Sequence, residues 1–211
     1  MDKIDFKKDY KELYSASEKK VSELTVPAFK YLMYSGKGSP NNNPDFADAM
    51  DSLFSVAYTL KFTLKFNAAI QPSGYIDYTV APVQTSWCGE GGVFNPERPE
   101  TWVWTCMIPQ PDFITPALVK KAKEEVVRTR TKKKERIPGI EKLEFKKIAG
   151  YRAVQRMHIG PYGEVGATYK MLTDYLEEKG KKVKGSPLEI YISDPRRVAV
   201  EKLKTIVRFP V

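Results

Sequence analysis

A carboxylate and a phenol lie two residues apart in a short apolar segment near the C-terminus. In "PLEIYISDP", residues 187–195, Leu188 and Ile190 alternate with Glu189 and Tyr191. Alternation with a period of two predicts a β-strand, and the Asp-Pro pair predicts its end. Glu189 and Tyr191 therefore share one face, where a carboxylate could act as a counter-charge or general base and a phenol as a proton donor. The alternative is a solvated face, where most charged side chains lie.

Two indoles form the second candidate feature. In "ETWVWTCMI", Trp102 and Trp104 share one side of a predicted strand, while Val103 and its alternate neighbours share the other. If the Val103 side packs against helices, the indoles form an apolar patch on a face that no helix covers, which is unusual on a merely wet surface. Two interpretations stay open: the indoles fill a seam between two halves as core, or they line a groove that Glu189 faces.

The elements that must position these residues occur twice in the sequence. A strand, "FKYLMYSGKG" or "YRAVQRMHIG", is followed by an amphipathic helix and two further strands in each half. The apolar faces of the two helices have the same offsets of 0, 4, 7 and 11. They are Phe46, Met50, Leu53 and Ala57 in the first half, and Val165, Tyr169, Leu172 and Leu176 in the second.

This repeat predicts an α+β fold of duplicated strand-helix-strand-strand units, which form antiparallel sheets with helices on one face. We expect a single domain over residues 1–211, with halves at about 25–114 and 145–211 and a basic connecting helix at about 115–135. Aligning the two halves places Gln84 of "PVQTSWC" at the position of Glu189 in "PLEIYIS".

Composition narrows the classes of function. The formal net charge is +9, and residues 120–136 hold nine basic and three acidic side chains. No aromatic side chain is interleaved there, so we expect a solvated helix face and no nucleic-acid partner. Two cysteines and one histidine predict neither a structural zinc site nor another cofactor. The absence of a long apolar run and of a signal peptide predicts a cytoplasmic protein without a membrane partner.

Several segments, taken together, resemble the GyrI-like proteins, a family that includes drug-sensing domains of bacterial transcription regulators and gyrase inhibitors. They are "DFKKDYKELY", "VPAFKYLMYSGKGSPN", "DFADAMDSLFSVAYTLKF", "HIGPY", "PLEIYISDPRR" and "EKLKTIVRFPV". The resemblance implies a ligand cleft between the halves and a buried glutamate, here Glu189, that meets lipophilic aromatic cations. It also implies similarity to hydrolases that open the cyclopropane ring of DNA-alkylating compounds within an aromatic cage.

The cage candidates that the resemblance implies are Trp102, Trp104 and Tyr191, then Trp87 and Tyr34. One departure concerns Gln84, because many relatives carry a second glutamate at that position. Two functions from different classes follow: a binding protein that sequesters or senses aromatic compounds, and a hydrolase with Glu189 and Tyr191 as catalytic residues, which we favour. His158 of "HIGPY" is a further candidate lining residue, and gyrase inhibition rests on the family name alone.

Overall fold

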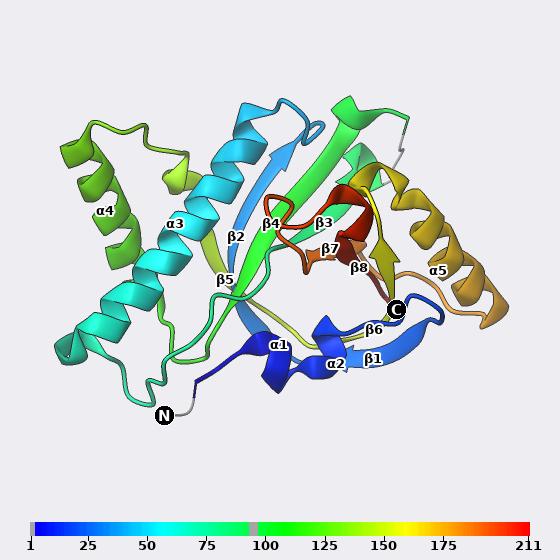
Figure 1. The fold of residues 1–211 in the computed structure, drawn as a ribbon, viewed down its shortest axis with the longest axis horizontal. Helices are drawn as coiled ribbons and strands as arrows, with labels where there is room; N and C mark the ends of the chain where they lie inside the picture. The colour runs from blue at the N-terminus through cyan, green and yellow to red at the C-terminus, as the bar shows by residue number, and fades with distance from the viewer. Residues whose placement is uncertain (1–2, 93–96) are drawn as a thin grey trace.

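One curled antiparallel sheet organises the chain (Figure 1). The structure is a computed structural model that describes residues 3–92 and 97–211. Within them the sheet has eight strands in the order β1-β6-β8-β7-β3-β4-β2-β5. The strands are β1 (Ser22–Val26), β2 (Phe29–Lys37), β3 (Gln84–Gly89), β4 (Trp102–Gln110), β5 (Glu144–Ile148), β6 (Tyr151–Ile159), β7 (Leu188–Tyr191) and β8 (Lys204–Pro210). The helices are α1 (Phe6–Asp9), α2 (Lys11–Tyr14), α3 (Pro44–Phe66), α4 (Pro116–Lys133) and α5 (Gly166–Glu178).

The predicted duplication is present. The order β2-α3-β3-β4 in the first half recurs as β6-α5-β7-β8 in the second. The halves meet where β3 pairs with β7, with Thr85 directly opposite Glu189. The predicted α+β class with antiparallel strands is confirmed, and the strands of both halves form one continuous sheet.

The strand before each repeat unit pairs with the other half. β1 precedes β2 in the chain but pairs with β6, whereas β5 precedes β6 but pairs with β2. The two connections run close together, since a Cβ added to Gly150 would lie 2.9 Å from the carbonyl oxygen of Val26. Glycine is required there because a side chain would collide with backbone. This reciprocal exchange ties the halves together, and no local pattern in the sequence predicts it.

Both repeat helices lie on the same face of the sheet. Tyr34, Cys106, Thr85, Glu189 and Val207 follow one another directly across β2, β4, β3, β7 and β8, so their side chains share a face. The Tyr34 hydroxyl donates a hydrogen bond to Asp45 of α3, and Val207 packs in the cluster that includes α5. The prediction of helices on one face is therefore correct. The seam between β3 and β7 lies between α3, which contacts β2 and β4, and α5, which contacts β6 and β8.

The N-terminal helices pack on the opposite face. Arg208 of β8 donates to the backbone carbonyl of Leu13, and the Gln155 amide donates to that of Glu12 over 2.8 Å. Gln155 also accepts from Arg208, so this buried guanidinium has only neutral partners among its described hydrogen bonds. Arg208 thus donates to the Gln155 side chain and the Leu13 backbone, and these hydrogen bonds attach α2 to the sheet.

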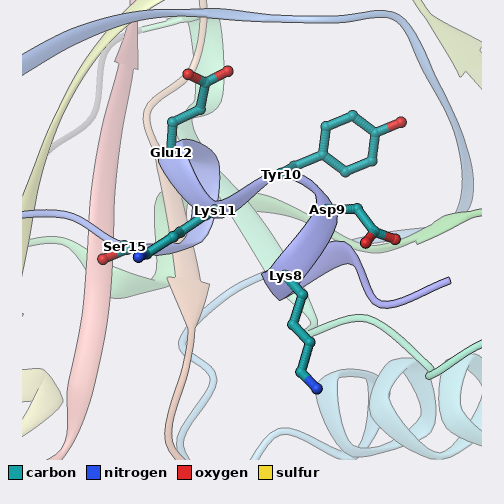
Figure 2. A pocket seen from close by; sticks show the side chains of 6 residues that line it. All are labelled: Lys8, Asp9, Tyr10, Lys11, Glu12 and Ser15. Atoms are coloured by element: carbon teal, nitrogen blue, oxygen red, sulfur yellow. The ribbon is translucent and has the colours of Figure 1, made fainter. Parts of the chain in front are cut away.

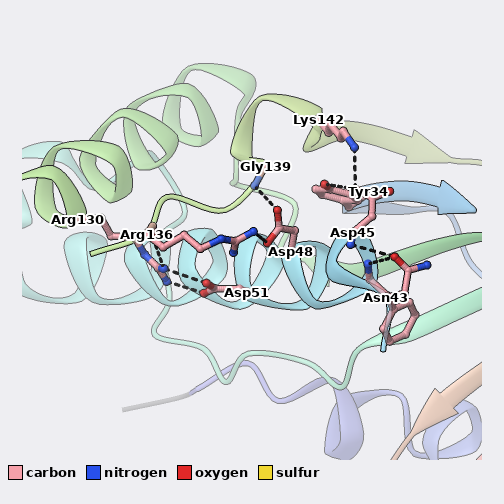
Figure 3. Close-up of polar contacts among 10 residues, drawn as sticks. Tyr34, Asn43, Asp45, Asp48, Asp51, Arg130, Arg136, Gly139 and Lys142 are labelled. Carbon is pink, nitrogen blue, oxygen red and sulfur yellow. Dashed lines mark hydrogen bonds and ion pairs between the residues drawn. The ribbon is translucent and has the colours of Figure 1, made fainter. Parts of the chain in front are cut away.

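The basic connecting helix is α4, and it docks on α3 through ion pairs (Figure 3). Three acids spaced along α3 each meet a basic residue from α4 or from the segment after it. The pairs are Asp51–Arg130 at 2.5 Å, Asp48–Arg136 at 2.5 Å and Asp45–Lys142 at 2.6 Å. Partly exposed pairs of this kind contribute at most about 1 kcal/mol each. Part of the positive charge of the connecting segment is therefore paired with acids of α3 within the protein.

None of the helices in the described ranges has the length and apolar character needed to cross a bilayer.

Candidate functional site

The Glu189 carboxylate lies at the seam between the halves and is held by two phenols. Its residue is 8% exposed. Oε1 accepts a hydrogen bond from the Tyr169 hydroxyl of α5 over 3.1 Å, and Oε2 accepts one from the Tyr191 hydroxyl over 3.0 Å. Tyr191 follows Glu189 by two residues on the same strand, so the predicted common face is correct. Two neutral donors thus fix both oxygens of one buried acid.

Burial dominates the protonation equilibrium of this acid. Removal from water raises the pKa of Glu189 above its ordinary value of 4.5, because it penalises the charged form. The hydroxyls of Tyr191 and Tyr169 lower the pKa but do not outweigh burial. The Trp87 indole also lies near enough to lower it, although its Nε1 makes no hydrogen bond in the described chain. Burial and the Glu189 charge both raise the pKa of Tyr169 and of Tyr191, so both phenols are neutral donors at pH 7.

Aromatic rings continue from this carboxylate into the first half. We call Tyr34, Phe46, Trp87, Trp102 and Trp104 the aromatic cluster. Trp87 contacts Trp102 edge-on at 5.7 Å between ring centroids and stacks on Phe46 at 6.2 Å. Phe46 contacts Trp104 edge-on at 5.0 Å, and Trp104 stacks on Tyr34 at 6.4 Å. Of the predicted cage residues, Trp87, Trp102 and Trp104 therefore belong to one connected group with Tyr34.

The interpretation that the indoles lie on a face without helices is wrong. Trp104 contacts Phe46 of α3, so the indoles lie on the helix-bearing face and the Val103 side does not. Both sides of this strand are apolar, and the sequence therefore did not distinguish them. The indoles nevertheless lie on the same face as Glu189, which is the face that carries the repeat helices and the seam between them. Trp104 itself is core, with 0% exposure and its Nε1 donating to the Gly38 carbonyl.

Gln84 does not face this site, which corrects its alignment with Glu189. It is paired with Ile190 and Met107, whose side chains lie on the opposite face. Thr85 is the residue opposite Glu189, and it shares the face of that acid, whereas Gln84 does not. A shift of one residue moves a strand side chain to the other face. The Thr85 hydroxyl instead lies 3.4 Å from the Cys106 thiol, and burial raises the pKa of that thiol to about 12.

His158 and Tyr34 lie on the site face but have other partners. The His158 ring contacts the Thr168 hydroxyl through Nδ1 and the Pro161 carbonyl through Nε2, each at 3.1 Å. Because a carbonyl only accepts, Nε2 carries the proton in this arrangement. The Tyr34 hydroxyl donates to Asp45 over 2.9 Å. Neither residue makes a described hydrogen bond to Glu189.

Two aromatic residues near the carboxylate are not among the candidates from the sequence. Tyr169 lies on the apolar face of the second repeat helix, a position typical of packing residues. A tyrosine on such a face needs a partner for its hydroxyl, and that requirement is the available signal. Tyr162 contacts Tyr191 edge-on at 5.4 Å between ring centroids, and no pattern in the sequence points to it.

A separate surface depression borders the N-terminal helices (Figure 2). It measures about 590 Å³ and is lined by Lys8, Asp9, Tyr10, Lys11, Glu12 and Ser15. These side chains point outward and include charges of both signs, and none belongs to the aromatic cluster. Its shallow polar lining lacks the apolar walls and convergent polar groups of a small-molecule site. No three potential metal ligands gather anywhere in residues 3–92 and 97–211.

Comparison with known proteins identifies the family. Residues 115–211 match the model of the GyrI-like small molecule binding domain. A crystal structure of an uncharacterized conserved protein from Listeria innocua is 33% identical, with 98% of each chain covered and a TM-score of 0.86. A second structure from the same organism, a hydrolase, is 32% identical, with 98% of each chain covered and a TM-score of 0.81. The chain belongs to the GyrI-like family.

The fold recurs in more distant proteins. The C-terminal domain of EcmrR has a TM-score of 0.53 at 15% identity, over 90% of this chain and 96% of that one. At this identity the likeness concerns the fold alone. No curated protein matches the sequence.

Proposed function

We propose that the protein binds flat, lipophilic aromatic molecules at Glu189, with a preference for cations. The observation that carries this proposal is a buried carboxylate that has two phenol partners and no basic partner among the described residues. An acid taken out of water without a counter-charge is costly to ionise. A cationic ligand supplies the missing charge. The membership of the chain in a family with a small-molecule binding domain supports the same conclusion.

The rings beside the carboxylate suit such a ligand. Trp87 lies beside Glu189, and Trp102 extends the apolar surface through its edge-on contact with Trp87. Each cation–ring contact contributes about 0.5–2 kcal/mol when water is excluded. The same surfaces bind neutral planar molecules through buried apolar area. The charge therefore determines the preference for cations, and the rings determine the preference for planar shape.

A matched pair of probes tests this proposal. N-methylacridinium and acridine share one ring system, but only the first is charged at pH 7.5. We expect N-methylacridinium to bind at least about tenfold more tightly, which corresponds to about 1.4 kcal/mol. Quenching of tryptophan fluorescence measures both affinities, since the indoles line the proposed site. Equal affinities would remove Glu189 as the counter-charge, and no binding of either probe would contradict the proposal as a whole.

We further propose that the ligand class includes strained cyclopropanes that the protein hydrolyses. A Listeria innocua protein named a hydrolase is 33% identical over 99% of both chains, which supports this second step. Glu189 takes a proton from a water molecule whose oxygen attacks the strained ring carbon. The ring C–C bond breaks, its electron pair moves into a conjugated dienone, and the carbonyl oxygen takes the hydroxyl proton of Tyr191. Glu189 then returns a proton to Tyr191 along their 3.0 Å hydrogen bond, so the net change is addition of one water.

Isotopic water tests the hydrolysis. The protein is incubated with a spirocyclopropyl cyclohexadienone in H₂¹⁸O, and the product is analysed by mass spectrometry. We expect a phenol that carries ¹⁸O on the former ring carbon, formed faster than in a protein-free control. General base catalysis contributes on the order of 10²–10⁴-fold. Recovery of the unchanged compound, with binding retained, would leave only the binding function.

A further inference from the structure

The Glu189 site is closed by aromatic rings, and these rings differ in how firmly they are held. Three aromatic residues adjoin the carboxylate, namely Trp87, Tyr169 and Tyr191, and a fourth, Tyr162, contacts the ring of Tyr191. Trp87 is buried, and Tyr169 and Tyr191 are partly buried and bonded to Glu189. Tyr162 is 38% exposed and makes no hydrogen bond through its hydroxyl in the described chain. Tyr162 is therefore the ring that a ligand can displace at the lowest cost.

Tyr162 lies over the other groups of the site. Its ring meets that of Tyr191 edge-on, at 5.4 Å between centroids and 77° between planes. Burial and the nearby charge of Glu189 raise the pKa of Tyr162. Tyr162 is thus exposed to water and in contact with the ring of Tyr191. Moving this ring would open the carboxylate to solvent and to a ligand.

The segment that carries Tyr162 is short and has a backbone turn at its start. β6 ends at Ile159, and Gly160 adopts φ +130°, a conformation that other residues rarely take. Tyr162–Glu164 then form a single 3₁₀ turn before α5 begins. His158 holds the base of this segment, because its Nε2 donates to the Pro161 carbonyl while its Nδ1 meets Thr168 of α5. The base is thus fixed, whereas the Tyr162 side chain beyond it is held by its ring contact with Tyr191 and by no hydrogen bond of its hydroxyl among the described residues.

We propose that Tyr162 is the gate and a specificity-determining residue of the Glu189 site: its ring moves aside to admit a flat ligand and then packs on the exposed face of that ligand. This inference rests on the proposed binding function. It adds a residue that the family match does not assign and predicts that access is limited by side-chain motion. Binding that requires such a change proceeds more slowly than simple docking.

Stopped-flow fluorescence with N-methylacridinium tests the gate. We expect Tyr162→Ala to raise the association rate constant about tenfold, because the ring no longer has to move. Dissociation should accelerate as well, since the ring can no longer cover the ligand. Tyr162→Phe should behave like the wild type, because the hydroxyl has no described partner. Tyr58→Ala removes a ring of similar exposure, 45%, from α3 and serves as the control.

A ligand-free measurement separates the gate from the binding proposal. Carboxyl ¹³C titration reports the pKa of Glu189 directly. We expect Tyr162→Ala to lower this pKa toward 4.5, because water reaches the acid. An unchanged pKa, an unchanged association rate with binding retained, or equal behaviour of the Phe and Ala variants would each overturn the gate. If neither the wild type nor Tyr162→Ala binds the probe, the binding proposal fails, and the titration alone decides whether Tyr162 covers the acid.

Discussion

Glu189→Gln abolishes the preference of the protein for cationic ligands. We expect the affinity for N-methylacridinium to fall at least about tenfold, to that for acridine, since only the charged probe gains from the carboxylate. The affinity for acridine should change little, because the rings of the aromatic cluster stay in place. Under the hydrolase proposal the same variant loses turnover, since an amide cannot accept the proton of water. Parallel fluorescence titrations and product analysis measure both effects.

The same substitution should not weaken the fold at neutral pH. Burial raises the folded-state pKa of Glu189 above its ordinary 4.5. The acid therefore stabilises the fold most below pH 4.5, and this contribution is lost as the pH rises through the folded-state pKa. Glutamine does not titrate, so the variant avoids the loss. We expect its free energy of unfolding, relative to that of the wild type, to increase from pH 4 to pH 7 in urea titrations.

Glu201→Gln provides the control for charge alone. Glu201 is an exposed carboxylate in the connection between β7 and β8, and its removal changes the net charge by the same amount. We expect probe affinity and the pH dependence of stability to remain those of the wild type. If both glutamine variants lower the affinity for N-methylacridinium equally, the long-range field of the protein and not Glu189 is responsible. If Glu189→Gln is destabilised at pH 7, the acid is a structural element.

Gly36→Ala should disrupt the aromatic cluster and lower stability by about 1–3 kcal/mol, the cost of overpacking a filled core. Gly36 pairs with Trp104 across β2 and β4, and the indole leans over it. An added Cβ would lie 2.3 Å from Cη2 of Trp104 and 2.6 Å from Oδ2 of Asp45. The methyl group can fit only if the indole and the Asp45 carboxylate both move away. Thermal and urea unfolding measure the loss of stability, and near-UV circular dichroism reports the displaced indole.

Gly166→Ala is the matched control for this substitution. Gly166 begins α5, and a Cβ added there meets no atom within 4 Å. Alanine also has the better helix propensity, so we expect unchanged or slightly higher stability. Comparable destabilisation by both variants would show that the Gly36 contact is not specific. Retention of wild-type probe affinity in Gly36→Ala would indicate that Trp104 supports the fold without shaping the site.

The repeat, and the common face of Glu189 and Tyr191 on β7, could be predicted from the sequence because both follow from local periodicity. The two helix faces share their offsets, and the alternation in "PLEIYIS" fixes Glu189 and Tyr191 on one side of a strand. These patterns follow from backbone geometry and do not depend on distant partners. They predicted the order of elements in both halves and the common face of the carboxylate and the phenol.

The faces of β4 and the register of β3 could not be predicted in the same way. Both sides of β4 are apolar: α3 contacts one face, and on the other face Met107 is also buried. Alternation therefore gave no preference for the Trp104 side. In β3, Gln84 and Thr85 are adjacent, and only the pairing of Thr85 with Glu189 decides which one faces the seam. The exchange of β1 and β5 between the halves likewise depends on pairing across the whole chain.

A crystal structure with N-methylacridinium bound would show whether Glu189 is the ligand site. We expect the acridinium ring against Trp87, its charged nitrogen close to the Glu189 carboxylate and the Tyr162 ring moved from its contact with Tyr191. Density for the probe elsewhere, for example in the depression beside the N-terminal helices (Figure 2), with the Glu189 site unchanged, would contradict this expectation.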